Sequence, residues 1–165
     1  MVITIGREFG SGGKYIGQKL AEELGMQLYD KEILNKVSEE SGIDLKVLEE
    51  VDEKQEQSFW YTFARSMYSS ADSITTMSEI PSNEKLFIEQ AKVIEELSEK
   101  ENCIIIGRCS NLILKESPDV LNVFVYSSDM EFKINRKMKY DNYENATDAL
   151  KDIQRIDVHN RNIFS

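Results

Sequence analysis

The fold is decided by the stretch Val2–Leu24, which reads VITIGREFGSGGKYIGQKLAEEL. It begins with a short apolar run, passes through a glycine-rich turn, and then repeats apolar residues at helical spacing. Because Gly10 and Gly12 lack a Cβ atom, the backbone around them can turn several N–H groups toward one anion. The first turn of the following helix adds further N–H groups and the positive end of its dipole. This order of strand, turn and helix predicts a phosphate-binding loop.

The loop matches the phosphate-binding motif G-x-x-x-x-G-K-[ST] imperfectly. If Gly13 and Lys14 are its glycine–lysine pair, Glu8 takes the place of the first glycine, and Tyr15 follows the lysine in place of the usual magnesium-binding hydroxyl. If the frame is shifted by one, the segment 10–12 forms the core of the loop and Gly13 stands where the lysine belongs. The sequence leaves both registers open.

In either register we expect the loop to bind the phosphates of a nucleotide, with Lys14 offering a mobile ammonium group. The predicted ligands are consecutive: Gly10, Ser11, Gly12, Gly13, Lys14 and Tyr15. The simple alternative is a glycine-rich connection between strand and helix that binds nothing.

Composition sets outer limits. A chain of 165 residues with 41% hydrophobic residues suits one folded domain. A net charge of −10 disfavours nucleic acid as a partner, although a local basic pocket can still bind a nucleotide. No apolar run approaches the roughly 20 residues that span a bilayer, so we expect no membrane partner. The N-terminus begins with a strand and not a signal peptide, so we expect a cytoplasmic protein. Cys103 and Cys109 have no metal-site spacing and are expected to be buried thiols.

Apolar runs alternate with amphipathic helical stretches along the chain. We predict strands at 2–6, 28–29, 103–106 and 121–126, and helices that end near 24 and 41, with later ones beginning near 84, 130 and 146. Such alternation is typical of an α/β fold with a short parallel sheet between two layers of helices. The segment 44–82 is expected to be a helical insertion on the acceptor side. Its aromatic residues could stack on a base, but their spacing equally suits core packing.

Two polar residues are expected at the carboxyl ends of strands, where parallel α/β sheets bind ligands. Arg108 follows a buried strand and Gly107, so its guanidinium could bind a phosphate through two hydrogen bonds. Asp30 follows the short second strand. It could contact a substrate, or it could simply cap the helix that follows.

Four segments together resemble the cytidylate kinase-like branch of the P-loop nucleoside monophosphate kinases. They read ITIGREFGSGGKYIGQKLAEELG, LYDKEIL, FIEQAKVIEELSEKENCIIIGRCSNLIL and VLNVFVYSSDMEFKINRKM, in the order of the chain. The resemblance implies an adenylate-kinase-like P-loop fold over residues 1–165, with a lid and its following helix at 129–164. It also implies transfer of a phosphoryl group from ATP, carrying Mg²⁺, to a nucleoside monophosphate, with CMP as the first candidate.

The resemblance assigns roles by position. Lys14, Arg108, Arg136 and Arg161 would be catalytic, Asp30, Arg108 and Asp157 would contact the acceptor, and Lys133 is a weaker lid candidate. Phosphoryl transfer needs aligned phosphates and nearby positive charge, which these residue types supply. No protein ligands for a metal are predicted. Arg136 and Arg161 could instead be ordinary exposed helix charges.

Some features depart from the family pattern. Tyr15 replaces the usual residue with a magnesium-binding hydroxyl, and Cys109 stands where cytidylate kinases tend to have aspartate. This fold would also normally add a strand beyond Ser165. A sheet without that strand has an open edge, which a homodimer would cover. Two alternatives to the kinase therefore stay open: a nucleotide-binding regulatory module without turnover, and a kinase of a metabolite that is not a nucleotide.

Overall fold

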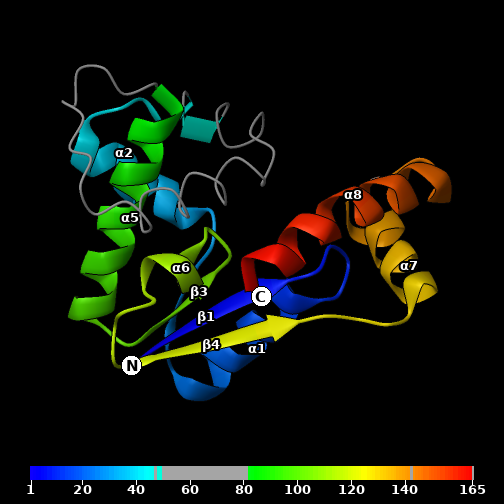
Figure 1. The fold of residues 1–165 in the computed structure, drawn as a ribbon, viewed down its shortest axis with the longest axis horizontal. Helices are drawn as coiled ribbons and strands as arrows, with labels where there is room; N and C mark the ends of the chain where they lie inside the picture. The colour runs from blue at the N-terminus through cyan, green and yellow to red at the C-terminus, as the bar shows by residue number, and fades with distance from the viewer. Residues whose placement is uncertain (47, 50–81, 142, 165) are drawn as a thin grey trace.

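The fold, seen in a computed structural model that describes residues 1–46, 48–49, 82–141 and 143–164, is built on a parallel sheet (Figure 1). In the part of the chain described, the sheet has four strands in the order β2-β3-β1-β4, and every pair is parallel. The strands are β1 (Val2–Arg7), β2 (Gln27–Tyr29), β3 (Cys103–Ile106) and β4 (Val120–Val125). The helices, numbered as in Figure 1, are α1 (Gly13–Leu24), α2 (Glu32–Ser41), α5 (Ser82–Lys100), α6 (Ser110–Ile113), α7 (Met130–Tyr140) and α8 (Ala146–Phe164).

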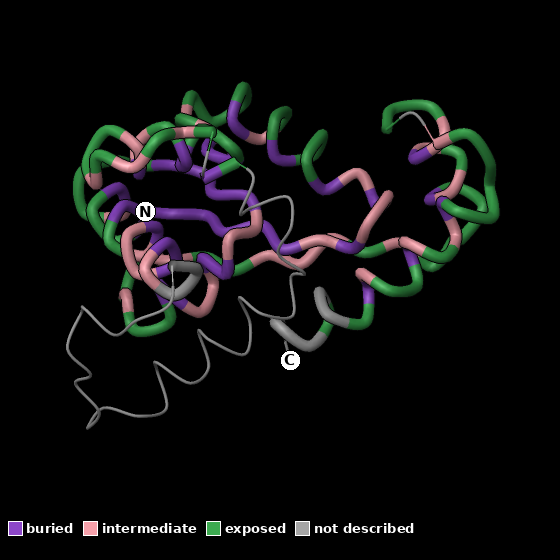
Figure 2. The backbone as a smooth tube through the Cα atoms, turned by 90° about the horizontal axis from the view of Figure 1, so that it is seen from above, coloured by how far each residue is buried: buried purple, intermediate pink, exposed green. Residues whose placement is uncertain are grey.

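Helices cover both faces of the sheet because successive strand residues point to opposite sides. On one face, Ile3, Ile5 and Ile104 pack with Ala21 of α1. On the other face, Cys103 and its neighbours pack against α2, α5 and α6. β1 and β3 form the buried centre of the sheet, whereas β4 at its edge has no buried residue (Figure 2). The predicted α/β class with a parallel sheet and helices on both faces is thus confirmed.

Helices α7 and α8 form a separate pair beyond the carboxyl end of β4 (Figure 1). The chain leaves β4, enters α7, and returns along α8, so that the last turns of α8 lie beside the end of β1. Asp129 begins α7 by accepting a hydrogen bond from the amide of Phe132 at 2.9 Å, an ordinary N-cap. This pair spans the segment 129–164, and its role as a lid stays a prediction.

The strand register brings the polar ends of the strands together. Arg7 is paired with Val125, and Tyr29 is paired with Ile105. The residues that follow β1, β2 and β3 therefore emerge at one edge of the sheet. This edge also receives the first turn of α1, which follows β1 through the glycine-rich loop.

One possible local role is contradicted, and one short helix was not predicted. Asp30 does not cap α2, because the N-cap position is held by Lys31 in a helical conformation and no side chain caps it. The short helix α6 was not predicted, since a single turn is too short to show a period.

Other expectations concern the cysteines, the sheet edge, membrane-spanning helices and the insertion. Cys103 and Cys109 are free and buried, as predicted. In the described sheet β4 is an edge strand, with Leu121 exposed. No helix of the described part is both long and apolar enough to cross a bilayer. Most of the predicted insertion at 44–82 lies outside the described residues.

Candidate functional site

The loop between β1 and α1 forms an anion cradle. Gly10 and Gly12 have φ angles of 80° and 89°, a region that glycine enters without strain. Gly12 is the N-cap of α1 and has no side chain to close the helix end. Within the part of the chain described, the amides from Gly12 to Tyr15 have no protein acceptor, and the first amide bonded in the helix is that of Ile16, to the Gly12 carbonyl at 3.0 Å. Unused amides at a helix start are suited to phosphate oxygens.

The hydroxyl of Ser11 lies inside the same loop. Ser11 is 7% exposed, and its Oγ is the one buried side-chain polar atom without a hydrogen-bond partner among the described residues. A buried hydroxyl without a partner costs about 1–3 kcal/mol. A ligand oxygen bound in the loop would supply the missing partner.

Helix α7 lies directly over the loop. A Cβ atom added to Gly10 would come within 2.8 Å of the Lys133 carbonyl oxygen, so only glycine allows α7 this close. A Cβ atom on Gly12 would be 3.4 Å from Cζ of Arg136. The Arg136 guanidinium also lies 5.6 Å from the Phe132 ring centroid and 5.3 Å from that of Tyr140. These rings hold the Arg136 charge above the cradle.

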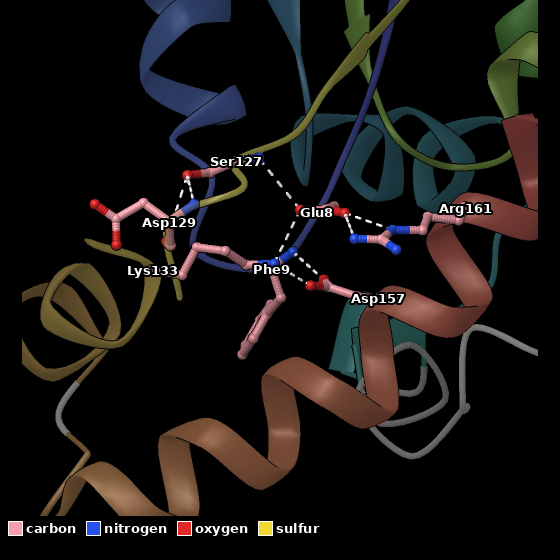
Figure 3. A network of polar contacts seen from close by, with 7 residues as sticks. All are labelled: Glu8, Phe9, Ser127, Asp129, Lys133, Asp157 and Arg161. Atoms are coloured by element: carbon pink, nitrogen blue, oxygen red, sulfur yellow. Dashed lines mark hydrogen bonds and ion pairs between the residues drawn. The ribbon is translucent and has the colours of Figure 1, made fainter. Parts of the chain in front are cut away.

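A buried ion network ties the loop to α7 and α8 (Figure 3). The carboxylate of Glu8, 1% exposed, accepts hydrogen bonds from Lys133 Nζ at 2.9 Å, from Arg161 Nε at 2.6 Å and from the Ser127 amide at 3.2 Å. The Asp157 carboxylate accepts a hydrogen bond from Lys133 Nζ. It accepts a second one, at 2.7 Å, from the Phe9 amide. Opposite charges from three segments of the chain, the loop, α7 and α8, thus meet at the start of the loop.

The network determines the ionisation of Glu8. Burial alone would raise the pKa of this carboxyl group. The hydrogen bonds from Lys133, Arg161 and Ser127 outweigh burial and lower the pKa of Glu8 below its ordinary value. Glu8 is therefore a carboxylate at neutral pH and anchors the two cations.

Three predicted lid residues are found in or near this network. Arg161 and Asp157 face Glu8 and the loop backbone, as Figure 3 shows, and Lys133 is buried between the two acids. Arg136 stands apart, over Gly12. The structure therefore brings all four to the loop, while contact of Arg161 or Asp157 with a substrate stays a prediction.

The other end of the site gathers around Asp30, at the end of β2. Its carboxylate is 2.9 Å from Lys14 Nζ and 4.0 Å from an Nη atom of Arg7. Lys14 is thus turned toward β2, and its side chain is 56% exposed. Tyr15 is also 56% exposed. The Asp30 side chain is 12% exposed and forms ion pairs with Lys14 and Arg7. These ion pairs, and not a helix cap, account for its burial.

Arg108 sits in an unusual turn after β3. Gly107, Arg108 and Cys109 have consecutive positive φ angles of 70°, 61° and 53°. Positive φ costs a non-glycine residue on the order of 1 kcal/mol, and such strain concentrates at functional sites. The buried Gln90 of α5 contacts both ends of Arg108: its Oε1 is 3.4 Å from Nη1, and its Nε2 is 3.5 Å from the carbonyl oxygen. Gln90 therefore orients Arg108.

A groove of about 450 Å³ lies beside α7 and α8, lined by Phe9, Lys137, Asp141, Tyr143, Glu144 and Asp148. Lys137 Nζ is 3.3 Å from the Phe9 ring centroid and 2.7 Å from Asp141. Burial lowers the pKa of Lys137, while Asp141 raises it and Arg7 lowers it. Because the groove carries three carboxylates, it is not suited to phosphate. Lys137, which lines the groove, contacts Phe9 and so connects α7 to the loop.

Several residues of this site were not among those predicted from the sequence: Arg7, Glu8 as an ion-pair centre, Gln90 and Ser127. Arg7 had a usable signal, because it ends a buried strand just as Arg108 follows one. Glu8 was noticed only as a mismatch to the motif. Gln90 and Ser127 carry no local signal, since their roles depend on contacts with segments far away in the chain.

The family model described as "Cytidylate kinase-like family" matches residues 2–165. The chain belongs to that family, as the four segments quoted above suggested. The family and the cradle together support a kinase-like protein that acts on a nucleotide or another small molecule. No curated protein matches the chain.

Among solved structures, one similar chain is an uncharacterized protein from Eubacterium ventriosum ATCC 27560. It is 25% identical with a TM-score of 0.62, and the match covers 97% of this chain and 73% of that one. A second is shikimate kinase from Acinetobacter baumannii in complex with shikimate, 17% identical with a TM-score of 0.45 over 98% and 78% of the two chains. The second likeness is too remote to bear on function.

Proposed function

We propose that this protein transfers the γ-phosphoryl group of ATP to a nucleoside monophosphate, with CMP as the first candidate. The observation that carries the proposal is the cradle itself: unused amides from Gly12 to Tyr15, the unpartnered Ser11 hydroxyl, and the Arg136 guanidinium over Gly12. These groups suit the donor phosphates. Membership of the cytidylate kinase-like family supports the choice of acceptor.

The acceptor would bind at the neighbouring edge, where Lys14 and Arg7 contact Asp30 after β2 and Arg108 follows β3. In the reaction, an oxygen of the acceptor phosphate forms a bond to the γ-phosphorus while the bond to the β,γ-bridging oxygen breaks. That electron pair leaves with ADP. Fixed cations on both sides stabilise the negative charge spread over the transferring group.

Mg²⁺ would neutralise phosphate charge when it arrives bound to the nucleotide. In the part of the chain described, no three His, Cys, Asp or Glu side chains gather into a metal site. The protein's own task is to orient the phosphates and to exclude water beneath α7.

The test is a coupled assay with ATP, Mg²⁺ and each common nucleoside monophosphate in turn, starting with CMP. Product from one of them supports the proposal. ATP binding without product on any acceptor would favour a regulatory module. Saturable ATP binding with no thermal shift from any monophosphate would favour a kinase of a different metabolite.

The role of Arg108 has its own readout in that assay. Arg108→Ala is expected to raise the acceptor KM or to lower kcat by about tenfold or more, since a charge-assisted bond to phosphate is lost. Its ATP affinity should change little. An effect confined to ATP would overturn the acceptor assignment.

A further inference from the structure

The side chain of Arg7 follows a path that two glycines leave open. A Cβ atom on Gly13 would lie 2.5 Å from Cβ and 3.1 Å from Cγ of Arg7. A Cβ atom on Gly107 would lie 2.3 Å from its Nη1. Arg7 therefore crosses from the first residue of α1 to the end of β3. Its guanidinium stands between the phosphate cradle and Arg108.

Arg7 has a weak ion pair and lies close to other positive charges. Its described ion pair is with Asp30 at 4.0 Å, the outer limit of such contacts, and Asp30 is already bound by Lys14 at 2.9 Å. Burial is the largest influence and lowers the pKa of Arg7, Asp30 raises it, and the positive charge of Arg108 lowers it again. Lys137 and Arg7 also repel each other. Arg7 and Lys14 thus share the Asp30 carboxylate, and Arg108 is close enough for its charge to lower the pKa of Arg7. An anion placed beside Arg7 would offset this repulsion.

The side chain of Arg7 is partly accessible. The Arg7 side chain is 32% exposed, so it is neither sealed in the core nor freely solvated. A guanidinium stays protonated in proteins and presents several donors in a plane, which suits phosphate oxygens. The site lies between the donor loop and the acceptor edge, where a phosphoryl group in transit would be.

We propose that Arg7 is the cation that binds the transferring phosphoryl group, in place of the lysine of the phosphate-binding motif. If the motif G-x-x-x-x-G-K-[ST] is laid on the chain from position 7, Arg7 stands where the first glycine belongs and Gly13 where the lysine belongs. The glycine and the cation have exchanged places. Gly13 has no side chain because that of Arg7 fills the space. The inference rests on the proposed function.

The first test measures binding of inorganic tripolyphosphate by calorimetry, which needs neither turnover nor a known acceptor. Arg7→Met keeps an unbranched stem along the same path and removes the guanidinium, and we expect it to weaken binding by about tenfold or more. The matched control is Arg155→Met on α8, where Arg155 is 55% exposed beside Asp152. The control should bind as the wild type does. Equal binding by Arg7→Met would overturn the inference.

The second test rebuilds the ordinary motif. Gly13→Lys alone should bind poorly, because its Cβ atom would clash with Arg7. Arg7→Gly alone should bind poorly because the cation is lost. Combined, the two substitutions restore both the space and the charge, and we expect binding within about threefold of the wild type. A folded double variant that binds no better than the single variants would count against the exchange.

The third test uses the wild-type protein and decides the matter if the variants do not fold. Phenylglyoxal labels arginine, and mass spectrometry reports each position. Saturating tripolyphosphate should slow labelling of Arg7 by about fivefold or more while Arg155 is labelled as before. Unchanged labelling of Arg7 would overturn the inference. If the wild type binds no tripolyphosphate at all, the proposed function itself fails, which is a different outcome from binding that ignores Arg7.

Discussion

At the scale of single residues, Glu8 is the side chain that connects the most distant parts of the site. Its carboxylate joins the end of β1 to Lys133 of α7, Arg161 of α8 and the backbone after β4. Removing one partner of a buried ion network leaves the others uncompensated, which costs more than the network itself contributes.

Glu8→Gln keeps the shape of the side chain and removes its charge, so we expect it to lower the free energy of unfolding by about 3 kcal/mol near pH 7. Because the folded-state pKa of Glu8 is lowered, the charge stabilises the fold above the unfolded pKa of about 4.3 and this contribution disappears as pH falls through the lower folded value. The difference between the two proteins should therefore shrink in acid. Urea unfolding at neutral and acidic pH measures it, with Glu22→Gln on the exposed face of α1 as the control. A difference that is constant with pH would contradict the assignment.

Ser11→Ala tests the cradle with the opposite sign on stability. Because the Ser11 hydroxyl is buried without a partner, its removal should leave stability unchanged or raise it by about 1 kcal/mol. The affinity for ATP should fall by about fivefold, the loss of one hydrogen bond. Ser38→Ala is the contrast, since Ser38 donates to the Ile43 carbonyl at 2.7 Å and should lose stability but not ATP affinity. Loss of stability without loss of affinity in Ser11→Ala would refute the role of the hydroxyl.

At the scale of elements, the contact between the loop and α7 sets the shape of the site. The Lys133 carbonyl approaches Gly10 so closely that a methyl group would push α7 away. The Lys137 contact with Phe9 and the Arg136 position over Gly12 depend on the same approach.

Gly10→Ala should therefore be more harmful than glycine replacement elsewhere. Gly25 is the matched control: its φ of 62° is also positive, but a Cβ atom there would meet nothing within 4 Å. We expect Gly25→Ala to cost about 1 kcal/mol of backbone strain and Gly10→Ala clearly more, together with faster amide hydrogen exchange in α7. Thermal unfolding and hydrogen exchange compare the two. Equal costs, with α7 unaffected, would show that the close approach does not hold the lid.

The elements themselves could be predicted because their signals are local. The strand β3 is a short apolar run, and α1 ends at Leu24, with Gly25 as its C-cap, as expected. Asp30 was assigned partly to a helix cap because Asp before a helix is common, yet the ion pair with Lys14 took precedence. The role of Arg7 could not be read from spacing alone, since its path depends on glycines at 13 and 107, far apart in the sequence.

At the scale of the whole molecule, the centre of the sheet is the most deeply buried part. The residues of β3 are fully buried between helices on both faces, and Cys103 and Cys109 lie in or next to that strand. Burial, the largest cause, raises the pKa of Cys103 to about 11 and that of Cys109 to about 12. Both thiols are therefore protonated and shielded in the folded protein.

We expect both cysteines to resist a thiol reagent at mildly alkaline pH until the protein unfolds. In denaturant, 2 thiols per chain should react at once. A titration with the reagent across the unfolding transition measures this, and the reaction should follow global unfolding rather than movement of the lid. Rapid reaction of either thiol in the native state would place it outside the stable centre.

The turn at 107–109 has a consequence for the history of such a protein under selection. Two of its residues, Arg108 and Cys109, hold a conformation that other residue types at these positions would adopt more easily. A screen that rewards heat resistance alone would collect glycine or asparagine there, and in doing so would discard the guanidinium at position 108. A screen that rewards turnover would keep the arginine and accept the less comfortable backbone.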